Sequence, residues 1–407
     1  MPYEILVDDP KLIKTIKNQL EADRCFVKPV YSCGDYRVLR TSITDCTDPR
    51  LEGFTTRKYE LKEVAEQGIV GFTQRFLERH AVENINELLK CLPLRYTVYT
   101  PLLLFNFSKQ RSFKHPAWVS FFRDEGEEVK NSYFSDLLRT LFPKEVTHVA
   151  INMPIIETDV MRRPFNISPL YGELISPQLH TNDRLLDHPQ PSDFDGTVWC
   201  HVTQNGIKQF WAPMFTMFSR GNIKEKKRVL DTFVEIQDND VVDLYAGIGY
   251  FTLSYLKRGA RNVFCFELNP WSVEALRRGL EANNFEQDRC HIYNESNEWS
   301  TQRLKEHSSK LRVRHINLGL LPSSKPGWPL ALAIISLQQS LPIVTLHIHE
   351  NVHINALNDN TFISQALSEL KTHNGSYEYS AIHLEKIKTF APDVWHVCLD
   401  VDVHTTL

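Results

Sequence analysis

The sequence predicts an α/β protein whose C-terminal part forms a doubly wound, mainly parallel sheet. From about residue 222, short strand-like runs alternate with amphipathic helical stretches, which is typical of βαβ units. A turn containing Gly247 and Gly249 joins the first of these runs to the helix that follows it. In such sheets the ligand crevice lies at the carboxyl ends of the strands, so we expect the functional site there.

Composition and charge restrict the class of protein. The chain has 407 residues, of which 42% are hydrophobic, and a formal net charge of −4. These values are ordinary for a globular protein of two or three domains. A net acidic chain does not bind nucleic acid through bulk positive charge, so any basic contact surface must be local.

The N-terminus and the cysteines predict a cytoplasmic protein. Residues 1–9 lack the basic and apolar segments of a secretory signal, and they are not rich in arginine. The most apolar stretch, Leu330–Ile348, is interrupted by Pro342 and two glutamines, so we expect no membrane span. The eight cysteines contain no Cys-x-x-Cys pair, and we expect reduced thiols.

The texture of the sequence divides the chain into three regions. Residues 1–145 form an α+β region of unknown role, with a helix over Phe72–Leu92 that is interrupted at Val82–Asn84. Residues 146–221 form a small β-rich domain, in which Asn205 and Gly206 predict a tight hairpin because both tolerate positive φ. Residues 222–407 form the alternating sheet domain.

The elements of the third region follow in order. Asn222 and Glu225 predict a capping box that opens a helix to about Val234. The later pattern predicts helices over Thr252–Arg258 and Trp271–Asn283. It predicts strands over Val241–Tyr245, Asn262–Glu267, His291–Tyr293, Arg314–Leu318, Ile343–Ile348 and Val394–Asp400.

Two acids near the glycine turn indicate the kind of nucleotide. Asp243 ends the first strand, and Glu267 ends the next, where a carboxylate accepts both ribose hydroxyls of an adenosine. The turn lacks the third glycine of a dinucleotide loop, and bulky Tyr250 follows it at once. Acids would repel a pyrophosphate, whereas S-adenosylmethionine carries a sulfonium and an ammonium group. This pattern favours S-adenosylmethionine, with a cofactor-free sheet as the alternative.

Two further segments are candidates for ligand contact. The third strand is followed by Tyr293–Asn297, whose polar side chains would face the adenine unless the segment is only a solvated turn. The basic run Arg220–Arg228 is either a solvated helix face or a contact for a cofactor carboxylate and an RNA phosphate. His347, His349 and His353 suggest a metal, but no further ligand pattern completes a site. We therefore expect no metal and interpret these histidines as polar residues at a strand edge.

Six segments together resemble the wybutosine-synthesis aminocarboxypropyltransferases of fungal type, which are related to the tRNA guanosine-37 N1-methyltransferases. The resemblance is dense from about Thr147 onward and loose before it. The segments that carry it are Pro164–Gly172, Trp211–Lys226, Asp243–Leu253, Glu267–Pro270, Asn317–Ser324 and Leu346–Val352.

The resemblance implies a fold, a reaction and a partner. The fold is a Rossmann-like class I methyltransferase sheet, and the small β-rich domain before it would contact the tRNA. The reaction is transfer of the 3-amino-3-carboxypropyl group of S-adenosylmethionine to C7 of 4-demethylwyosine at position 37 of phenylalanine tRNA, which releases methylthioadenosine. The partner is the anticodon loop of that tRNA. Leu320–Ser324 stands where methylating relatives have an Asn-Pro-Pro-like motif, which favours the transferase.

The resemblance also implies site residues. Ser219, Lys226, Glu267 and the pair Ser296–Asn297 match family positions that contact the cofactor. Other members carry Asp-Asn at the last pair, so Glu295 is the candidate to supply the acid. With Asp243 and Gly247 from the turn, these residues form the expected cofactor site. The base that removes the proton from C7 is not identified; Glu295 and His315 are weak candidates. The alternatives are a tRNA guanosine-37 N1-methyltransferase and a non-catalytic tRNA-binding protein.

Overall fold

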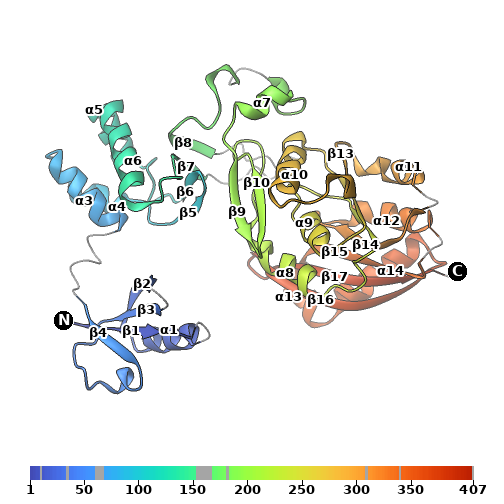
Figure 1. Ribbon diagram of the computed structural model, residues 1–407, viewed down its shortest axis with the longest axis horizontal. Helices are drawn as coiled ribbons and strands as arrows, with labels where there is room; N and C mark the ends of the chain where they lie inside the picture. The colour runs from blue at the N-terminus through green and yellow to red at the C-terminus, as the bar shows by residue number, and fades with distance from the viewer. Residues whose placement is uncertain are drawn as a thin grey trace. The chain divides into compact units, whose positions relative to one another are not determined.

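The computed structural model describes most of the chain and divides it into two compact units (Figure 1). The first unit comprises residues 1–94 and 109–143, and the second comprises residues 95–108 and 144–407. The predicted boundary near residue 145 lies beside one of these divisions, but residues 95–108 group with the C-terminal part; the three-region division stays a prediction. The described residues are 1–9, 12–33, 36–59, 68–152, 167–179, 183–307, 310–338 and 341–405.

The first unit begins with a four-stranded sheet of order β2-β3-β1-β4. Its elements are β1 (Tyr3–Val7), α1 (Ile13–Ala22), β2 (Phe26–Cys33), β3 (Tyr36–Thr41) and β4 (Thr55–Lys58). Ile5, Leu20 and Leu39 are buried between the sheet and α1. One face of this sheet therefore packs against the amphipathic helix.

The rest of the first unit is helical and has an aromatic core. Its helices are α3 (Ile69–Arg79), α4 (Ile85–Cys91), α5 (Pro116–Glu125) and α6 (Glu127–Leu141). The gap between α3 and α4 confirms the predicted interruption at Val82–Asn84. Phe76, Trp118 and Tyr133 are almost fully buried, and the Trp118 indole donates a hydrogen bond to the Leu88 carbonyl at 3.1 Å.

The second unit begins with a small mixed sheet and a hairpin. The sheet has the order β5-β6-β7-β8, with β6 and β7 parallel. The hairpin confirms the prediction at Asn205 and Gly206, whose φ angles are +53° and +69°. The strands are β5 (Tyr96–Tyr99), β6 (Leu102–Asn106), β7 (His148–Asn152), β8 (Ile167–Tyr171), β9 (Cys200–Gln204) and β10 (Ile207–Trp211). Residues 164–166 of the family-like segment Pro164–Gly172 lie outside the described residues.

A seven-stranded sheet of order β13-β12-β11-β14-β15-β17-β16 forms the larger part of the second unit. The first five strands of that order are parallel, and β17 pairs antiparallel with both β15 and β16. This confirms a mixed α/β fold with a mainly parallel sheet. The strands are β11 (Asp240–Asp243), β12 (Asn262–Phe266), β13 (Cys290–Tyr293), β14 (Val313–Leu318), β15 (Ile343–His353), β16 (Glu378–Ala391) and β17 (Val394–His404).

Helices cover both faces of this sheet, as Figure 1 shows. Alternating side chains of the strands enter two different cores. Val242 and Phe264 pack with α11, α12 and α14, whereas Val241 and Val263 pack with α8, α9 and α10. The helices are α7 (Pro191–Asp195), α8 (Ile223–Asp231), α9 (Thr252–Lys257), α10 (Pro270–Ala282), α11 (Ser300–Lys305), α12 (Trp328–Ile335), α13 (Ile354–Asn358) and α14 (Thr361–His373).

The capping box predicted at the start of α8 is not formed. Asn222 precedes α8 as expected, but its side chain makes no capping hydrogen bond, and α8 ends at Asp231 rather than near Val234. The Glu225 carboxylate binds the Arg228 guanidinium instead of closing a capping box, because Arg228 lies one turn further along the helix.

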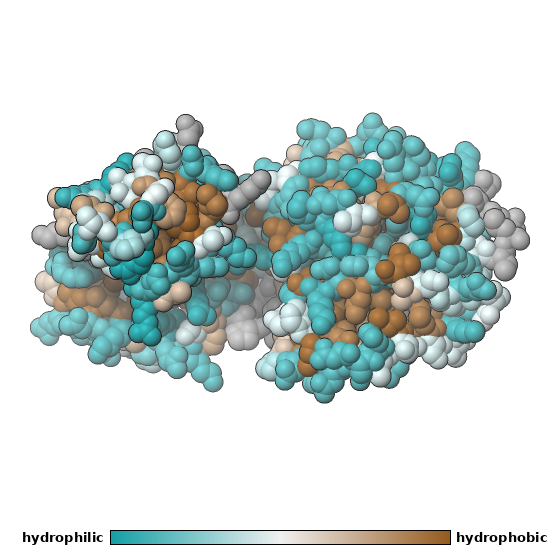
Figure 2. All heavy atoms as spheres, turned by 90° about the horizontal axis from the view of Figure 1, so that it is seen from below, coloured by the Kyte–Doolittle hydropathy of each residue, from teal (hydrophilic) through white to brown (hydrophobic). Residues whose placement is uncertain are grey.

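The polarity of the surface and of the helices bears on the prediction that the chain has no membrane span. Figure 2 shows hydrophilic residues over much of the visible surface, with hydrophobic residues between them. Across the described part of the chain, no helix combines the length and the apolar character needed to cross a membrane.

Candidate functional site

The glycine turn after β11 is built as the sequence predicts. Gly247 and Gly249 have φ angles of +54° and +82°, in the region that favours glycine. A Cβ at Gly249 would lie 2.5 Å from Leu276 Cδ1 of α10, so a side chain there would force the Leu276 side chain to move. The turn therefore brings the backbone close to α10 and leads directly into α9.

A cavity of about 570 Å³ opens beside this turn. Its volume lies within the range of small-molecule sites. The lining segments follow β11, β12, β13 and β14, which is the carboxyl edge of the sheet where the site was expected. It is lined by residues 216–222, Leu244, Tyr245, Gly247, Ile248, Tyr250, Phe251, 266–269, Ser272, Glu295, Asn297, 319–321, Lys388 and Phe390.

Glu267 lines the cavity in a fixed orientation. Its Oε2 accepts a hydrogen bond from the Gly247 N–H, and its Oε1 accepts one from the Asn269 N–H, both at 2.8 Å. Burial raises the pKa of this carboxyl, and the two N–H donors oppose that rise. The carboxylate oxygens keep further acceptor capacity, which suits a pair of vicinal hydroxyl groups.

Asp243, in contrast, lies beneath the turn and does not line the cavity. It is fully buried, and its carboxylate accepts hydrogen bonds from Thr252 Oγ1 at 2.8 Å and from Asn317 Nδ2 at 2.9 Å. Burial raises its pKa, although both partners oppose the rise. In this position Asp243 connects the end of β11 to the start of α9 and to β14, so the structure assigns it to supporting the turn.

The loop after β13 contributes two of its three predicted residues. Glu295 lines the cavity and forms a bidentate pair with Arg303 of α11, at 2.7 and 2.8 Å. The hydrogen bonds to Arg303 lower the pKa of Glu295. Asn297 also lines the cavity and donates to the Leu244 carbonyl at 3.0 Å. Ser296 is not among the lining residues; its Oγ accepts a hydrogen bond from the Glu298 N–H.

Lys226 lies behind the cavity wall rather than in it. Its Nζ donates to Gln204 Oε1 at 2.5 Å and to Gln209 Oε1 at 2.7 Å, and the side chain is buried. The rings of Phe218 and Tyr250, which line the cavity, lie 5.2 and 5.7 Å from Nζ. Burial lowers the pKa of Lys226 to about 7. Its contact with a cofactor stays a prediction.

Ser219 lines the cavity and meets a residue from a distant strand. Its Oγ accepts a hydrogen bond at 3.1 Å from Nζ of Lys388, which belongs to β16. The Ser219 N–H donates to the Tyr250 hydroxyl at 3.2 Å. Arg220 also lines the cavity, and its guanidinium donates to Thr97 Oγ1 at 2.6 Å.

Known proteins are similar to this chain in sequence. The TRM5/TYW2 methyltransferase domain family matches residues 201–308. The tRNA wybutosine-synthesizing protein 2 of Saccharomyces cerevisiae is 49% identical, with 99% of this chain and 98% of the relative covered. The protein of that name from Schizosaccharomyces pombe is 35% identical over 98% of this chain and 93% of its own length. The chain belongs to the tRNA wybutosine-synthesizing protein 2 family.

Solved structures share the fold of this family member. The structure of Pyrococcus horikoshii TYW2 in complex with MeSAdo has a TM-score of 0.55 and 22% identity, with 82% of this chain and all of that chain covered. Trm5b of Pyrococcus abyssi has a TM-score of 0.53 and 16% identity over 99% of this chain. At these identities the likeness concerns the fold alone.

Several residues that line the cavity were not predicted as site residues. Tyr250 was regarded only as a bulky residue after the turn, and Lys388 and Phe390 fall in a stretch with no assigned element. Ile387, Thr389 and Phe390 favour a strand there, but the alternation of apolar and polar residues around them is weak. No local signal places that strand beside Ser219, because 169 residues separate Ser219 from Lys388.

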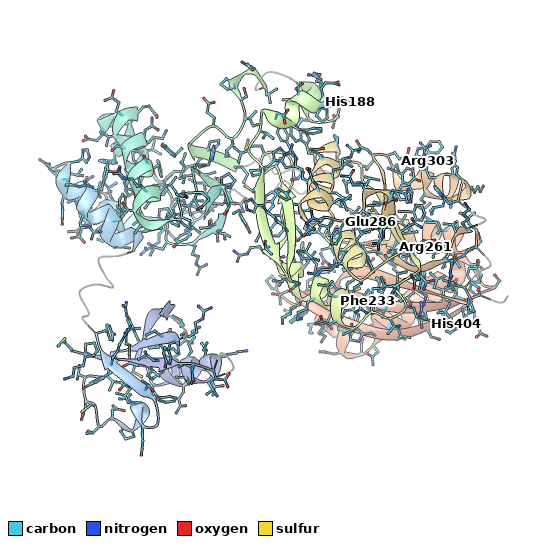
Figure 3. The ribbon with its side chains drawn as sticks, viewed as in Figure 1. His188, Phe233, Arg261, Glu286, Arg303 and His404 are labelled. Carbon is cyan, nitrogen blue, oxygen red and sulfur yellow. The ribbon has the colours of Figure 1, made fainter. Side chains whose placement is uncertain are left out.

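Two of the three histidines considered for a metal are buried in the sheet, so their interpretation as strand-edge residues is wrong. His347 Nδ1 lies 2.7 Å from Asp400 Oδ1, and His347 stacks on Phe233, which Figure 3 labels. His349 Nδ1 lies 2.9 Å from His396 Nε2. They are inside because β17 covers the flank of β15.

These histidines belong to a polar network away from the cavity. His315, a weak candidate for the base, contacts His347 at 3.0 Å and does not line the cavity. Cys398 lies near His347 and Asp400, and near His349 and Glu225, in two groups spaced closely enough to ligate a metal. Arg228 forms ion pairs with both acids, and its charge disfavours a second cation there.

Proposed function

We propose that this protein transfers the 3-amino-3-carboxypropyl group of S-adenosylmethionine to C7 of 4-demethylwyosine at position 37 of phenylalanine tRNA. The single observation that carries the proposal is the 49% identity to a tRNA wybutosine-synthesizing protein 2 over nearly the whole of both chains. The protein is an S-adenosylmethionine-dependent aminocarboxypropyltransferase of wybutosine synthesis. The proposal also includes three specific points. C7 is the acceptor atom, the anticodon loop is the part of the tRNA that docks, and the protein is located in the cytoplasm.

The residues around the cavity fit this substrate. The sheet and turn have the arrangement of a class I methyltransferase-like domain. Glu267 offers its carboxylate to ribose hydroxyls, and its place at the end of β12 supports that role. Glu295 and Asn297 present polar groups for an adenine. Ser219 supplies a hydroxyl at the segment proposed for the methionine part. Asp243 supports the turn through Thr252 and Asn317, and Lys226 supports the wall beneath Phe218 and Tyr250.

The chemistry requires control over which carbon reacts. The sulfonium of S-adenosylmethionine supplies three electrophilic carbons, and the reacting one must lie in line with C7 at about 3–3.5 Å. The new bond joins C7 to the γ-carbon of the aminocarboxypropyl chain, and the carbon–sulfur bond breaks with its electron pair on sulfur. Methylthioadenosine and a proton from C7 leave. The protein's part is to fix the ribose and the amino-acid end so that the γ-carbon faces the base.

The modified base must leave the anticodon-loop stack to reach the cavity. Arg220 is exposed, lies at this cavity and belongs to the basic run Arg220–Arg228, which supports a role in guiding RNA phosphate. The tRNA contact is therefore local, as the net charge of −4 requires.

Mass spectrometry of the modified tRNA tests the proposal. The full chain is incubated with S-adenosylmethionine and phenylalanine tRNA that carries 4-demethylwyosine. A gain of about 101 Da on the base, with methylthioadenosine released, is the expected result, because that is the mass of the aminocarboxypropyl group. A gain of about 14 Da would instead identify a methyltransferase, which is the second candidate. If the protein binds S-adenosylmethionine but the mass of the base does not change, the protein would be the non-catalytic tRNA-binding protein of the third alternative.

A further inference from the structure

Lys388 reaches the cavity from the edge of the seven-stranded sheet. It lies on β16, where it pairs in register with His396 of β17. Its Nζ contacts Ser219 Oγ at 3.1 Å, and both residues line the cavity. The C-terminal hairpin of β16 and β17 thus contributes a cation to the segment that precedes α8.

The segment before α8 is shaped around this lysine. Gly221 has no side chain, and a Cβ there would lie 2.4 Å from Lys388 Cδ and 2.8 Å from its Nζ. The aliphatic stem of Lys388 therefore rests directly on the Gly221 backbone, which directs its ammonium group to Ser219. Phe390, two residues further along β16, lines the same cavity.

The charges around the cavity indicate what Lys388 binds. Among the described residues that line it, the cations are Arg220 and Lys388, and the acids are Glu267 and Glu295. Arg220 is exposed and directed to Thr97. S-adenosylmethionine carries one carboxylate, on the aminocarboxypropyl group, and a carboxylate in a partly enclosed site needs a cationic partner.

We propose that Lys388 binds the α-carboxylate of the aminocarboxypropyl group and so orients the group that is transferred. The inference rests on the proposed function, since it names the residue that holds the reacting chain. The basic run Arg220–Arg228, which contains Lys226, was the predicted contact for this carboxylate. The ammonium group of Lys226, however, is turned to Gln204 and Gln209. Ser219 completes the pair by turning its hydroxyl from Asn222 Oδ1, at 3.4 Å, to the same carboxylate while it accepts from Lys388.

Binding of two ligands by one variant tests the proposal. S-adenosylmethionine has the aminocarboxypropyl group, whereas methylthioadenosine has the same adenosine and sulfur without it. In K388M, the Kd for S-adenosylmethionine measured by calorimetry is expected to rise about tenfold or more, because a charge-assisted hydrogen bond is lost. The Kd for methylthioadenosine is expected to stay unchanged. K388R is expected to recover part of the S-adenosylmethionine affinity.

Lys386 provides the matched control. It lies on the same strand, outside the cavity lining, with its Nζ 6.0 Å from the Trp395 ring centroid. K386M should bind both ligands as the wild-type protein does. An equal loss for both ligands in K388M would assign Lys388 to the fold of the cavity and overturn the proposal. An unchanged Kd for S-adenosylmethionine would overturn it as well. The product mass of the wild-type reaction separately reports a failure of the proposed function.

Discussion

At the scale of single residues, the acids expected at the cofactor have different positions. Glu267 and Glu295 line the cavity, whereas Asp243 is enclosed beneath the turn. All three lie at or just after the carboxyl ends of neighbouring strands, so the sequence could place them at that edge of the sheet. It could not show which of them face the cavity and which lie beneath the turn. The difference arises because Asp243 finds two side-chain partners inside the protein, Thr252 and Asn317.

Replacing Glu267 should weaken both adenosine ligands equally. E267A removes the acceptor proposed for the ribose, which S-adenosylmethionine and methylthioadenosine share, so both Kd values should rise about tenfold or more. Calorimetry measures the two constants. E274A, at a half-buried site of α10 outside the cavity lining where Glu274 pairs with Arg278, is the control and should change neither. A loss for S-adenosylmethionine alone would place Glu267 at the amino-acid end.

The buried Lys226 should make stability depend on pH. Burial lowers its pKa from 10.5 to about 7, so between these values the unfolded chain binds more protons than the folded protein. The contribution of this group to the free energy of unfolding therefore increases from pH 7 toward pH 10.5. In K226M this contribution disappears, and the slope from pH 7 to 9 in urea unfolding should be smaller. K224M, at an exposed site on the same helix, should keep the wild-type slope.

At the scale of elements, local chemistry predicted the glycine turn and the hairpin, and long-range packing decided the rest. The Asn205–Gly206 hairpin and the β11 turn depend on positive φ at a few adjacent residues, which the residue types reveal. The capping box at Asn222 failed because Glu225 found a stronger partner in Arg228, which itself pairs with Asp400 of β17. β16 was missed because most of its side chains are exposed and its apolar pattern is weak.

The turn offers a prediction that separates steric clash from backbone strain. Gly249 and Gly259 both have positive φ, but a Cβ would lie 2.5 Å from Leu276 Cδ1 at Gly249 and no closer than 3.6 Å to any atom at Gly259. G249A should therefore lose about 1–3 kcal/mol more unfolding free energy than G259A, because the buried Leu276 side chain must move in a packed core. Urea unfolding measures both variants. Equal losses would mean that Leu276 adjusts without cost.

At the scale of the whole molecule, contacts join parts of the chain that the sequence separates. Residues 95–108 supply β5 and β6 to the sheet that β7 and β8 complete, although 109–143 intervene. The predicted boundary near 145 therefore cuts between strands of one sheet. Composition showed the change of texture there, but the parallel pairing of β6 with β7 is long-range and left no local signal. The contact between Lys388 and Ser219 was hidden for the same reason.

Truncation tests this organisation. A chain that starts at residue 146 lacks β6 and exposes the edge of β7, whose Val149, Ala150 and Ile151 are buried in the full chain. It should aggregate during expression, since unpaired apolar edges promote association. A chain that starts at residue 68 keeps this sheet and all four helices α3 to α6, and it should remain monodisperse in size-exclusion chromatography. Aggregation of both chains would show that the removed N-terminal residues are also needed.

The place of β17 in the sheet has a consequence for synthesis on the ribosome. In chain order β17 is the last of the seven strands, yet it lies between β15 and β16 and is the sheet partner of β16. While the chain grows, the glycine turn and the acids at the strand ends emerge first and can pack with their helices. The strand that carries Lys388 then has no sheet partner until residues 394–404 have left the exit tunnel. The part of the cavity proposed for the adenosine is thus complete before the part proposed for the carboxylate.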